Sequence, residues 1–223
     1  MFSVVNVRSV DDLTARARIR DAAVLRFGRD GFGASVRAVA EDAGVSPALV
    51  IHHFGSKAAL REACDEHVLR VLHDAKSAAL VDQSPAEVVA SIATAEQYAP
   101  LFGYVQRSLT GGGALAVRFV DDLVRETVAY LEDGVRAGTV HPSRDPEGRA
   151  RLLVTLMIGM FVSARIDAEA GRGPDPAQDA AATMRALYAR TMLPGLELYT
   201  HGLFTDSAYL DAYLAYADQQ EEP

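Results

Sequence analysis

Residues 36–57 read VRAVAEDAGVSPALVIHHFGSK and contain the signals for two short helices separated by a tight turn. Ser35 and Ser46 each precede a helical segment and are suited to cap it, and Pro47 occupies a first helical position, where its missing N–H costs nothing. Gly44 provides the conformational freedom that the turn requires. Helix, turn and helix in this order form the helix-turn-helix pattern, whose second helix enters the major groove of DNA.

The segments on both sides of this pattern also favour helices. Apolar residues recur at near-helical spacing over residues 13–27, and Ser56 begins a helix that extends to about residue 80. We find no convincing strand and no internal repeat in the sequence, so the predicted fold class is all-α. Further helices are expected over residues 85–97, 100–109, 114–137, 147–170 and 178–193, the last of them kinked or ended by Pro194, with a short terminal helix from Thr205.

The composition is that of a globular protein, with 49% hydrophobic and 23% charged residues. The longest apolar run, residues 152–162, is shorter than the roughly 20 residues that span a bilayer, and the N-terminus lacks the pattern of a signal peptide. The single cysteine, Cys64, permits no internal disulfide and fits a reducing compartment. We therefore expect a cytoplasmic protein.

The net charge of −8 is unevenly distributed along the chain. Residues 14–61 contain eight Lys and Arg residues against four Asp and Glu residues, whereas the remainder contains fourteen against twenty-six. A basic segment on an acidic body is a recognised sign of a nucleic-acid-binding end, although a solvated charged face produces the same pattern.

The adjacent His52 and His53 have three possible interpretations. Neighbouring residues on a helix point about 100° apart, so the two rings cannot readily chelate one metal ion. Catalysis would need a nucleophile and an orienting group, and the sequence contains neither a GxSxG elbow nor a phosphate-binding glycine loop. The third interpretation is an anion-binding surface, with free N–H groups at the helix starts of Ser46 and Ser56 and a full charge on Lys57. We expect no metal, no cofactor and no enzymatic activity.

Residues 16–64 resemble the N-terminal DNA-binding domain of TetR-type (tetracycline-repressor-like) bacterial transcriptional regulators. The resemblance covers DAA…F…GF in the first helix, SVR-VA--AGVS at the turn and HHFGSK at the end. It implies a helix-turn-helix three-helix domain over residues 1–60 and a ligand-binding and dimerisation domain over residues 61–223. It also implies phosphate contacts by Ser35, Arg37, Ser46, His53 and Lys57, and base-edge contacts by Pro47, Ala48 and His52.

The chain departs from the family pattern at one position of this domain. The family usually has a tyrosine just before the paired histidines, where it contacts the DNA backbone, and this chain has Ile51. That phosphate contact is missing or is supplied by another residue. Pro47 and Ala48 offer no bidentate hydrogen bonds, so base recognition there would rely on apolar contact with thymine methyl groups.

A homodimer is expected because a helix-turn-helix covers one half-site and such motifs usually bind as dimers. The segment LLVTLMIGMFVSARI, residues 152–166, lacks a polar stripe, so a partner is expected to cover one face and the chain's own bundle the other. A fully buried helix of a monomeric core is the alternative. The predicted dimer interface contains Gly159, Ser163, Met184, Leu187, Tyr188 and Leu193.

The middle helices are expected to enclose a pocket for an apolar small-molecule inducer. The function that the resemblance implies is a dimeric repressor that such a ligand releases from a palindromic operator in double-stranded DNA. The alternative is a DNA-binding regulator without an inducer, which is constitutive or controlled by a protein partner. The predicted pocket residues are Leu101, Phe102, Val105, Leu109, Leu123 and Met160, with Tyr104 and Arg107 as polar groups.

Overall fold

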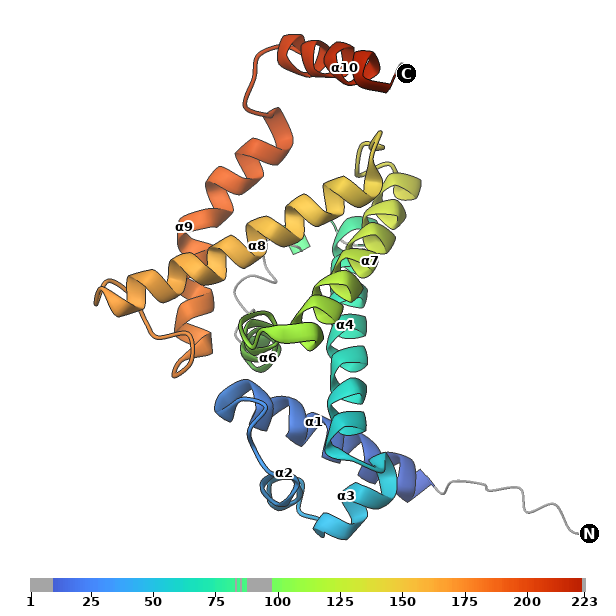
Figure 1. The fold of residues 1–223 in the computed structure, drawn as a ribbon, viewed down its shortest axis with the longest axis vertical. Coiled ribbons are helices and arrows are strands. Elements are labelled where there is room, and N and C mark those ends of the chain that lie inside the picture. The colour runs from blue at the N-terminus through green and yellow to red at the C-terminus, as the bar shows by residue number, and fades with distance from the viewer. Residues whose placement is uncertain (1–9, 83, 85, 88–97, 222–223) are drawn as a thin grey trace, which may run out of the picture. The chain divides into compact units, whose positions relative to one another are not determined.

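The computed structural model describes residues 10–82, 84, 86–87 and 98–221, and within these ranges it contains helices and connecting turns but no strand (Figure 1). The all-α prediction is confirmed. The helix expected over residues 85–97 lies outside the described residues, apart from residues 86 and 87. The helices are α1 (Val10–Asp30), α2 (Val36–Asp42), α3 (Pro47–Phe54), α4 (Lys57–Val81), α6 (Ala99–Thr110), α7 (Gly113–Ala137), α8 (Pro146–Glu169), α9 (Ala180–His201) and α10 (Ala208–Glu221).

The chain divides into two compact units, Met1–Arg185 and Ala186–Pro223. Helix α9 crosses the division, and α10 belongs to the second unit. The domain boundary expected near residue 60 lies inside α4 and inside the first unit. The assignment of residues 1–60 to DNA binding and residues 61–223 to ligand binding and dimerisation therefore stays a prediction.

Side chains cap the helices at the predicted positions. Ser35, Ser46 and Ser56 begin α2, α3 and α4, and each hydroxyl accepts a hydrogen bond from the backbone N–H three residues later. The carboxylate of Asp145 does the same for the N–H of Gly148 at the start of α8. These bonds satisfy N–H groups that have no partner within the helix, which explains why the helices begin where the sequence predicts.

Of the two alternatives expected for Pro194, a kink or the end of the helix, the second is wrong, because α9 continues to His201. A proline inside a helix removes one hydrogen bond, to the carbonyl four residues earlier, and crowds that carbonyl. Pro194 is exposed, so water can reach the carbonyl that loses its partner. The terminal helix expected from Thr205 is also present, as α10, and begins at Ala208.

Helix α4 connects the two parts of the first unit, because it packs against α1 at one end and against α7 along most of its length (Figure 1). The core beneath α1, α2 and α3 includes Phe27, Val39 and Val50, and it is continuous through Leu60 with the core around Phe119. No helix within the described ranges is long and apolar enough to cross a membrane.

Candidate nucleic-acid interface

The turn between α2 and α3 has the geometry that its sequence predicts. Gly44 adopts a φ of +64°, in the left-handed region that favours glycine. The N–H of Val45 donates to the carbonyl of Ala40 at 2.9 Å, and the N–H of Gly44 donates to that of Glu41 at 3.1 Å. These bonds close the C-terminus of α2 and direct the chain immediately into α3.

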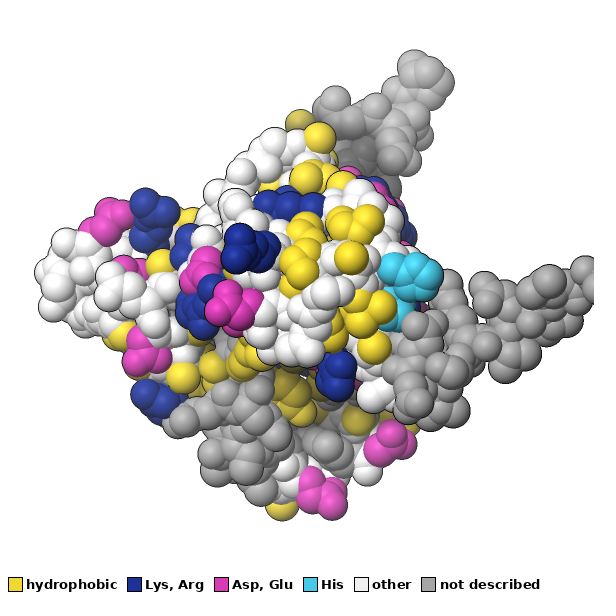
Figure 2. Space-filling view, turned by 90° about the horizontal axis from the view of Figure 1, so that it is seen from below, with side chains coloured by type: hydrophobic (Ala, Val, Ile, Leu, Met, Phe, Trp, Pro, Cys, Tyr) yellow, Lys and Arg dark blue, Asp and Glu magenta, His cyan; other side chains and the backbone are white. Residues whose placement is uncertain are grey.

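Helix α3 has one buried face and one exposed face. Val50 and Phe54, four residues apart, are buried in the core of the small domain. Pro47, Ala48 and His52 are exposed, so the predicted base-contacting residues lie together on the outer surface. A view from the side of α2 and α3 shows hydrophobic side chains next to histidine, with Lys and Arg side chains around them (Figure 2).

Ile51 lies on this outer surface and is 44% exposed. A single exposed apolar residue is common on a protein surface, whereas a group of neighbouring ones is informative. Together with Pro47 and Ala48 it makes the exposed face of α3 largely apolar. Such a face is suited to thymine methyl groups, whereas His52 supplies a hydrogen-bonding group.

The rings of His52 and His53 differ in their exposure to solvent. Their centroids are 5.5 Å apart and the ring planes are inclined by 66°. His52 is exposed, whereas His53 is half-buried, with its ring 6.4 Å from that of Phe54. No group of three or more potential metal ligands occurs among the described residues.

The serine hydroxyls can bind DNA phosphates while they cap the helices. In each of Ser35, Ser46 and Ser56 the hydroxyl oxygen accepts a backbone hydrogen bond at 3.1–3.2 Å. A hydroxyl has one proton to donate in addition, so each hydroxyl can donate to a phosphate oxygen. All three serines are exposed.

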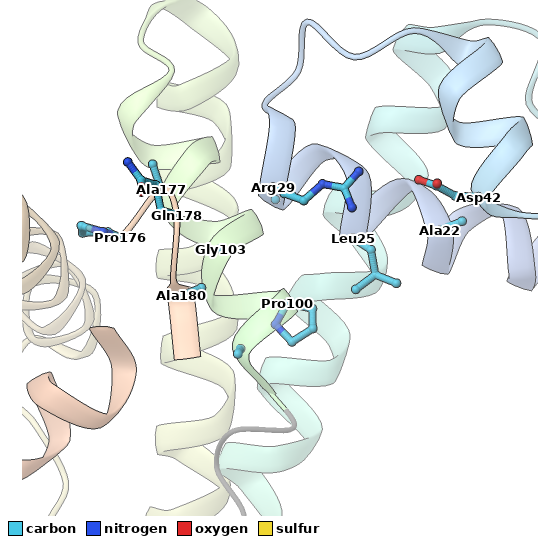
Figure 3. Close-up of a pocket in the computed structure, with 12 residues that line it drawn as sticks. Ala22, Leu25, Arg29, Asp42, Pro100, Gly103, Pro176, Ala177, Gln178 and Ala180 are labelled. Atoms are coloured by element: carbon cyan, nitrogen blue, oxygen red, sulfur yellow. The ribbon is translucent and has the colours of Figure 1, made fainter. Parts of the chain in front are cut away.

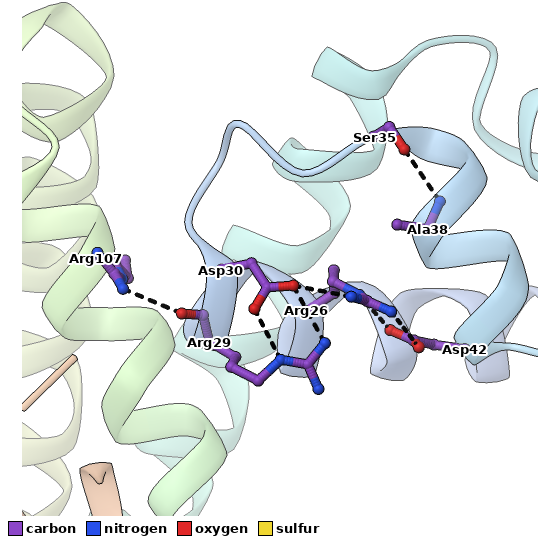
Figure 4. A network of polar contacts seen from close by, with 7 residues as sticks. All are labelled: Arg26, Arg29, Asp30, Ser35, Ala38, Asp42 and Arg107. Atoms are coloured by element: carbon purple, nitrogen blue, oxygen red, sulfur yellow. Dashed lines mark hydrogen bonds and ion pairs between the residues drawn. The ribbon is translucent and has the colours of Figure 1, made fainter. Parts of the chain in front are cut away.

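Most of the basic side chains in residues 14–61 are engaged within the chain. Arg26 donates to Asp42 at 2.6 Å and to Asp30 at 2.9 Å, and Arg29 donates to Asp30 at 2.8 Å (Figure 4). The hydrogen bonds from Arg29 and Arg26 hold the pKa of Asp30 well below its usual value. This network connects α1 to the end of α2 and reduces the charge available to an anion.

Two further arginines stack on aromatic rings. The guanidinium of Arg16 lies 4.9 Å from the ring centroid of Phe54, and that of Arg61 lies 3.5 Å from the centroid of Phe32. By contrast, Arg37 and Lys57 have no ion-pair partner within the part of the chain that the structure describes. Both were predicted to contact phosphates, and both charges are available to do so.

Helix α6 docks directly onto this small domain through two glycines. A Cβ atom placed on Gly28 of α1 would lie 3.0 Å from the backbone N of Tyr104 and 3.2 Å from the carbonyl O of Pro100. A Cβ on Gly103 would lie 3.5 Å from the carbonyl of Gly28. Arg107 donates to the carbonyl of Arg29 at 3.1 Å (Figure 4), so α6 also satisfies the C-terminal end of α1.

The predicted ligand residues are placed differently from the expectation. Tyr104 was predicted as a polar group of the pocket, but it is fully buried and its hydroxyl donates to Asp65 at 2.7 Å. Burial raises the pKa of both the Tyr104 hydroxyl and the Asp65 carboxyl. Val105 and Leu123 are buried, and Leu101, Phe102 and Leu109 pack against the core, while Met160 is half-buried.

Two cavities occur near α6. One of about 430 Å³ lies between α1, the start of α6 and the segment before α9, with Leu25, Pro100 and Ala180 in its lining (Figure 3). The other, of about 390 Å³, includes Arg107 and Arg165. Of the eight predicted pocket residues, Arg107 alone lines either of these two cavities, and the apolar ones other than Met160 pack in or against the core of the bundle.

The predicted interface residues also differ in exposure. Gly159 is exposed, with no atom within 4 Å of a Cβ placed on it, and Leu193 is exposed as well. Ser163 and Tyr188 are half-buried. Met184 and Leu187, however, are only 2% and 5% exposed. The assignment of these residues to a dimer interface stays a prediction.

Known proteins resemble the chain over most of its length. A family model described as bacterial regulatory proteins of the tetR family matches residues 19–64, and one described as the tetracyclin repressor-like C-terminal domain matches residues 96–205. A curated relative, the HTH-type transcriptional regulatory protein RaaS of Mycobacterium tuberculosis, is 47% identical over 210 residues. The aligned region covers 94% of this chain and 96% of the relative.

Solved structures share the fold at lower identity. A structure described as the molecular basis for control of antibiotic production by a bacterial hormone has a TM-score of 0.55 at 24% identity, covering 85% of this chain and 96% of the other. The transcriptional regulator FadR from Bacillus subtilis, in complex with stearoyl-CoA, has a TM-score of 0.54 at 14% identity, covering 84% and 99%.

Proposed function

The chain belongs to the tetR family of bacterial regulatory proteins and is a DNA-binding transcriptional regulator, and we propose that it is a dimeric repressor released from a palindromic operator by an apolar ligand. The observation that carries this proposal is the exposed face of α3 with two available cations, Arg37 and Lys57, beside it. The first residues of a recognition helix contact base edges, and cations beside it contact phosphates.

The proposed contacts divide into two classes. Arg37 and Lys57, with the hydroxyls of Ser35 and Ser46 and the ring of His53, bind phosphates and fix the position of the domain. Lys57 is the first residue of α4, so its charge adds to the positive end of that helix. On α3, Pro47, Ala48 and His52 face the bases, and the exposed Ile51 extends their apolar surface.

A dimer is supported by a row of residues on α8. Leu152, Leu156, Gly159, Ser163 and Ile166 follow one another at alternating spacings of four and three residues, which places them on one face of the helix. Leu152, Leu156 and Ile166 are exposed although they are large and apolar. A second copy packed along this row would cover them, and Gly159 at its centre permits the two helices to approach closely.

The ligand response is proposed to act through α6. On one side of this helix Phe102 contacts Phe161 of α8, with ring centroids 4.8 Å apart. On its other side Gly103, Tyr104 and Arg107 contact α1 and α4. A ligand that separates the two phenylalanine rings would press α6 against α1 and α4 and so change the positions of the recognition helices.

A regulator without an inducer is the second candidate, and one observation favours it. Most of the apolar residues predicted to line a pocket pack in or against the bundle core, and within the described residues none of them lines either of the two cavities near α6. A protein partner or constitutive repression would need no such cavity.

Titration calorimetry distinguishes these two functions. Stearoyl-CoA is a suitable first probe because FadR, a structural neighbour, is found in complex with it. If the probe is an inducer, its affinity falls when operator DNA is bound, and the operator affinity falls by the same factor, about 5–150-fold, when the probe is saturating. Unchanged operator affinity with stearoyl-CoA and with free fatty acids of similar length would favour the second candidate.

A further inference from the structure

We call the cavity of about 430 Å³ between α1, the start of α6 and the segment before α9 the junction cavity (Figure 3). Its volume falls within the range of roughly 300–1,000 Å³ that is typical of small-molecule sites. The small domain of α1, α2 and α3 forms one wall and the bundle forms the other. Every residue of the lining belongs to the first unit, Met1–Arg185, and none of them is a residue predicted to line the bundle pocket.

The walls of the junction cavity are held in place by the chain itself. Helix α1 approaches α6 closely at Gly28, where a Cβ would lie 3.0 Å from the backbone N of Tyr104. The segment before α9 is fixed by Asp175, whose carboxylate accepts from the N–H of Ala177 at 2.8 Å and whose carbonyl accepts from that of Gln178 at 3.0 Å. The cavity is therefore preformed, as most ligand sites are.

The inner surface of the cavity is mainly apolar. Ala22 and Pro176 are buried in its lining, and Leu25 of α1 and Pro100 of α6 lie on facing sides of it (Figure 3). Leu25 is 54% exposed, and a molecule in the cavity would remove its side chain from water. The hydrophobic effect therefore favours an apolar occupant.

The charges beside the cavity cancel one another. Arg29 and Asp42 belong to its lining. Hydrogen bonds join them to Arg26 and Asp30 in a network of two cations and two anions (Figure 4). An ionic ligand would lose its hydration without meeting a net opposite charge, which is unfavourable. The occupant is therefore expected to be neutral.

One hydrogen-bond donor of this network is unused. Arg29 donates to Asp30 from Nε at 2.8 Å and from Nη2 at 3.1 Å, whereas its Nη1 makes no hydrogen bond within the described residues. Both carboxylate oxygens of Asp42 already accept from Arg26. The wall thus offers a donor and no free acceptor, which suits the carbonyl oxygen of a ligand.

We propose that the junction cavity binds a compact, neutral and mainly apolar molecule with a carbonyl oxygen. Leu25 and Pro100 contact its apolar body, and the guanidinium of Arg29 donates to its oxygen. The site is additional to the bundle pocket of the proposed function and requires neither that pocket nor the dimer. Because its two walls belong to the small domain and to the bundle, an occupant holds α1 against α6.

Fluorescence titration of the full chain with prodan tests this site. Prodan is a compact neutral ketone on a naphthalene ring, and its emission shifts to shorter wavelengths in apolar surroundings. The expected result is a saturable shift with one site per chain. Acetonaphthone, which is also a neutral ketone, should displace prodan, whereas the anionic naphthoate should not displace it at the same concentration.

Two arginine variants locate the bound probe. Arg29→Ala removes the donor, so the Kd for prodan should rise about tenfold or more, the effect of losing a hydrogen bond to a charged group. The matched control is Arg165→Ala. Arg165 is exposed to a similar extent and also pairs with a carboxylate, but it lines the other cavity. The control should bind prodan with the Kd of the parent.

A charge in the apolar wall provides a second measurement. Leu25→Glu adds a carboxylate that a bound apolar ring would desolvate, so the Kd for prodan should again rise about tenfold or more. Its control is Leu115→Glu in α7, because Leu115 is 49% exposed and lines neither cavity. Circular dichroism checks that each variant is folded.

The outcomes decide both the site and the class of ligand. A parent chain that gives no saturable shift would overturn the site, and so would equal Kd values for the parent, Arg29→Ala and Leu25→Glu. Weaker binding by Arg165→Ala alone would assign the probe to the other cavity. Displacement by naphthoate as effective as that by acetonaphthone would overturn the neutral class. Operator binding is measured separately, so failure of this site leaves the proposed function standing.

Discussion

The hydroxyl of Tyr104 in α6 donates a 2.7 Å hydrogen bond to the carboxylate of Asp65 in α4, and this bond joins the bundle to the helix that enters the DNA-binding domain. Tyr104 also packs edge-on against Phe32, which lies just after α1. We therefore expect a movement of α6 to be transmitted to both α1 and α4. The following predictions test this connection, the DNA contacts and the dimer.

Asp65→Asn should remove a pH dependence of stability. Burial raises the pKa of the Asp65 carboxyl above its ordinary value of 3.8. The folded protein then retains the proton where the unfolded chain has lost it. The contribution of Asp65 to stability is thus fully present below about pH 3.8 and is lost as the pH rises through the raised pKa. Over this pH window, the free energy of unfolding measured with urea should decline less for Asp65→Asn than for the exposed control Asp74→Asn. Equal pH profiles would contradict the prediction.

Gly28→Ala should disturb the contact between α1 and α6. The added Cβ would meet backbone atoms of Tyr104 and Pro100 at 3.0 and 3.2 Å, and backbone cannot yield as a flexible side chain does. Overpacking of this kind costs about 1–3 kcal/mol, which exceeds the gain of up to about 1 kcal/mol in helix propensity. Gly33→Ala is the control, since nothing lies within 4 Å of its Cβ. An unfolding free energy of Gly28→Ala at or above that of the parent would argue against tight docking.

These two contacts also mark the limit of what the sequence could predict. Gly44, Ser46 and Pro47 act on their immediate neighbours, so the turn and the start of α3 follow from local chemistry alone. The approach of Gly28 to Gly103 and the bond from Tyr104 to Asp65 join residues far apart in the sequence, and no spacing rule pairs them.

The same distinction applies to the predicted interface residues. Periodicity identifies Met184 and Leu187 as apolar positions of a helix, but it does not decide whether the same chain or a partner covers them. The pocket prediction meets the same limit, because a filled core and a hollow bundle need the same residue types. Stacking of Arg16 on Phe54 and of Arg61 on Phe32 was likewise missed, because the members of each pair lie far apart in the sequence.

Lys57→Ala should weaken binding to all DNA sequences alike. A phosphate contact carries no sequence information, so the dependence of log K on log salt should become shallower by about one unit. The chain has one other lysine, Lys76, which lies far along α4 from its start, and Lys76→Ala is the matched control. Fluorescence anisotropy with specific and random duplexes over a salt series measures both quantities. Loss of discrimination at an unchanged salt slope would contradict the role of Lys57.

Gly159→Glu should yield a folded monomer. The residue is exposed with open space around its Cβ, so a glutamate is accommodated in a single chain. In the proposed dimer it would bury an unpaired carboxylate where two helices approach, which is strongly unfavourable. Light scattering gives the mass and circular dichroism confirms the helices. A Gly159→Glu chain that remains dimeric would move the interface away from this face of α8.

The central claim, that the exposed face of α3 reads DNA in a two-fold dimer, is tested most directly by selecting binding sites for the full chain from random duplex DNA. We expect a palindrome whose half-sites are separated by about one helical turn of DNA or a multiple of it. His52→Ala should relax the base preference at one or two positions per half-site, at a cost in binding free energy of about 1–3 kcal/mol. Selection that enriches no palindrome, or an identical site for the parent and His52→Ala, would contradict it.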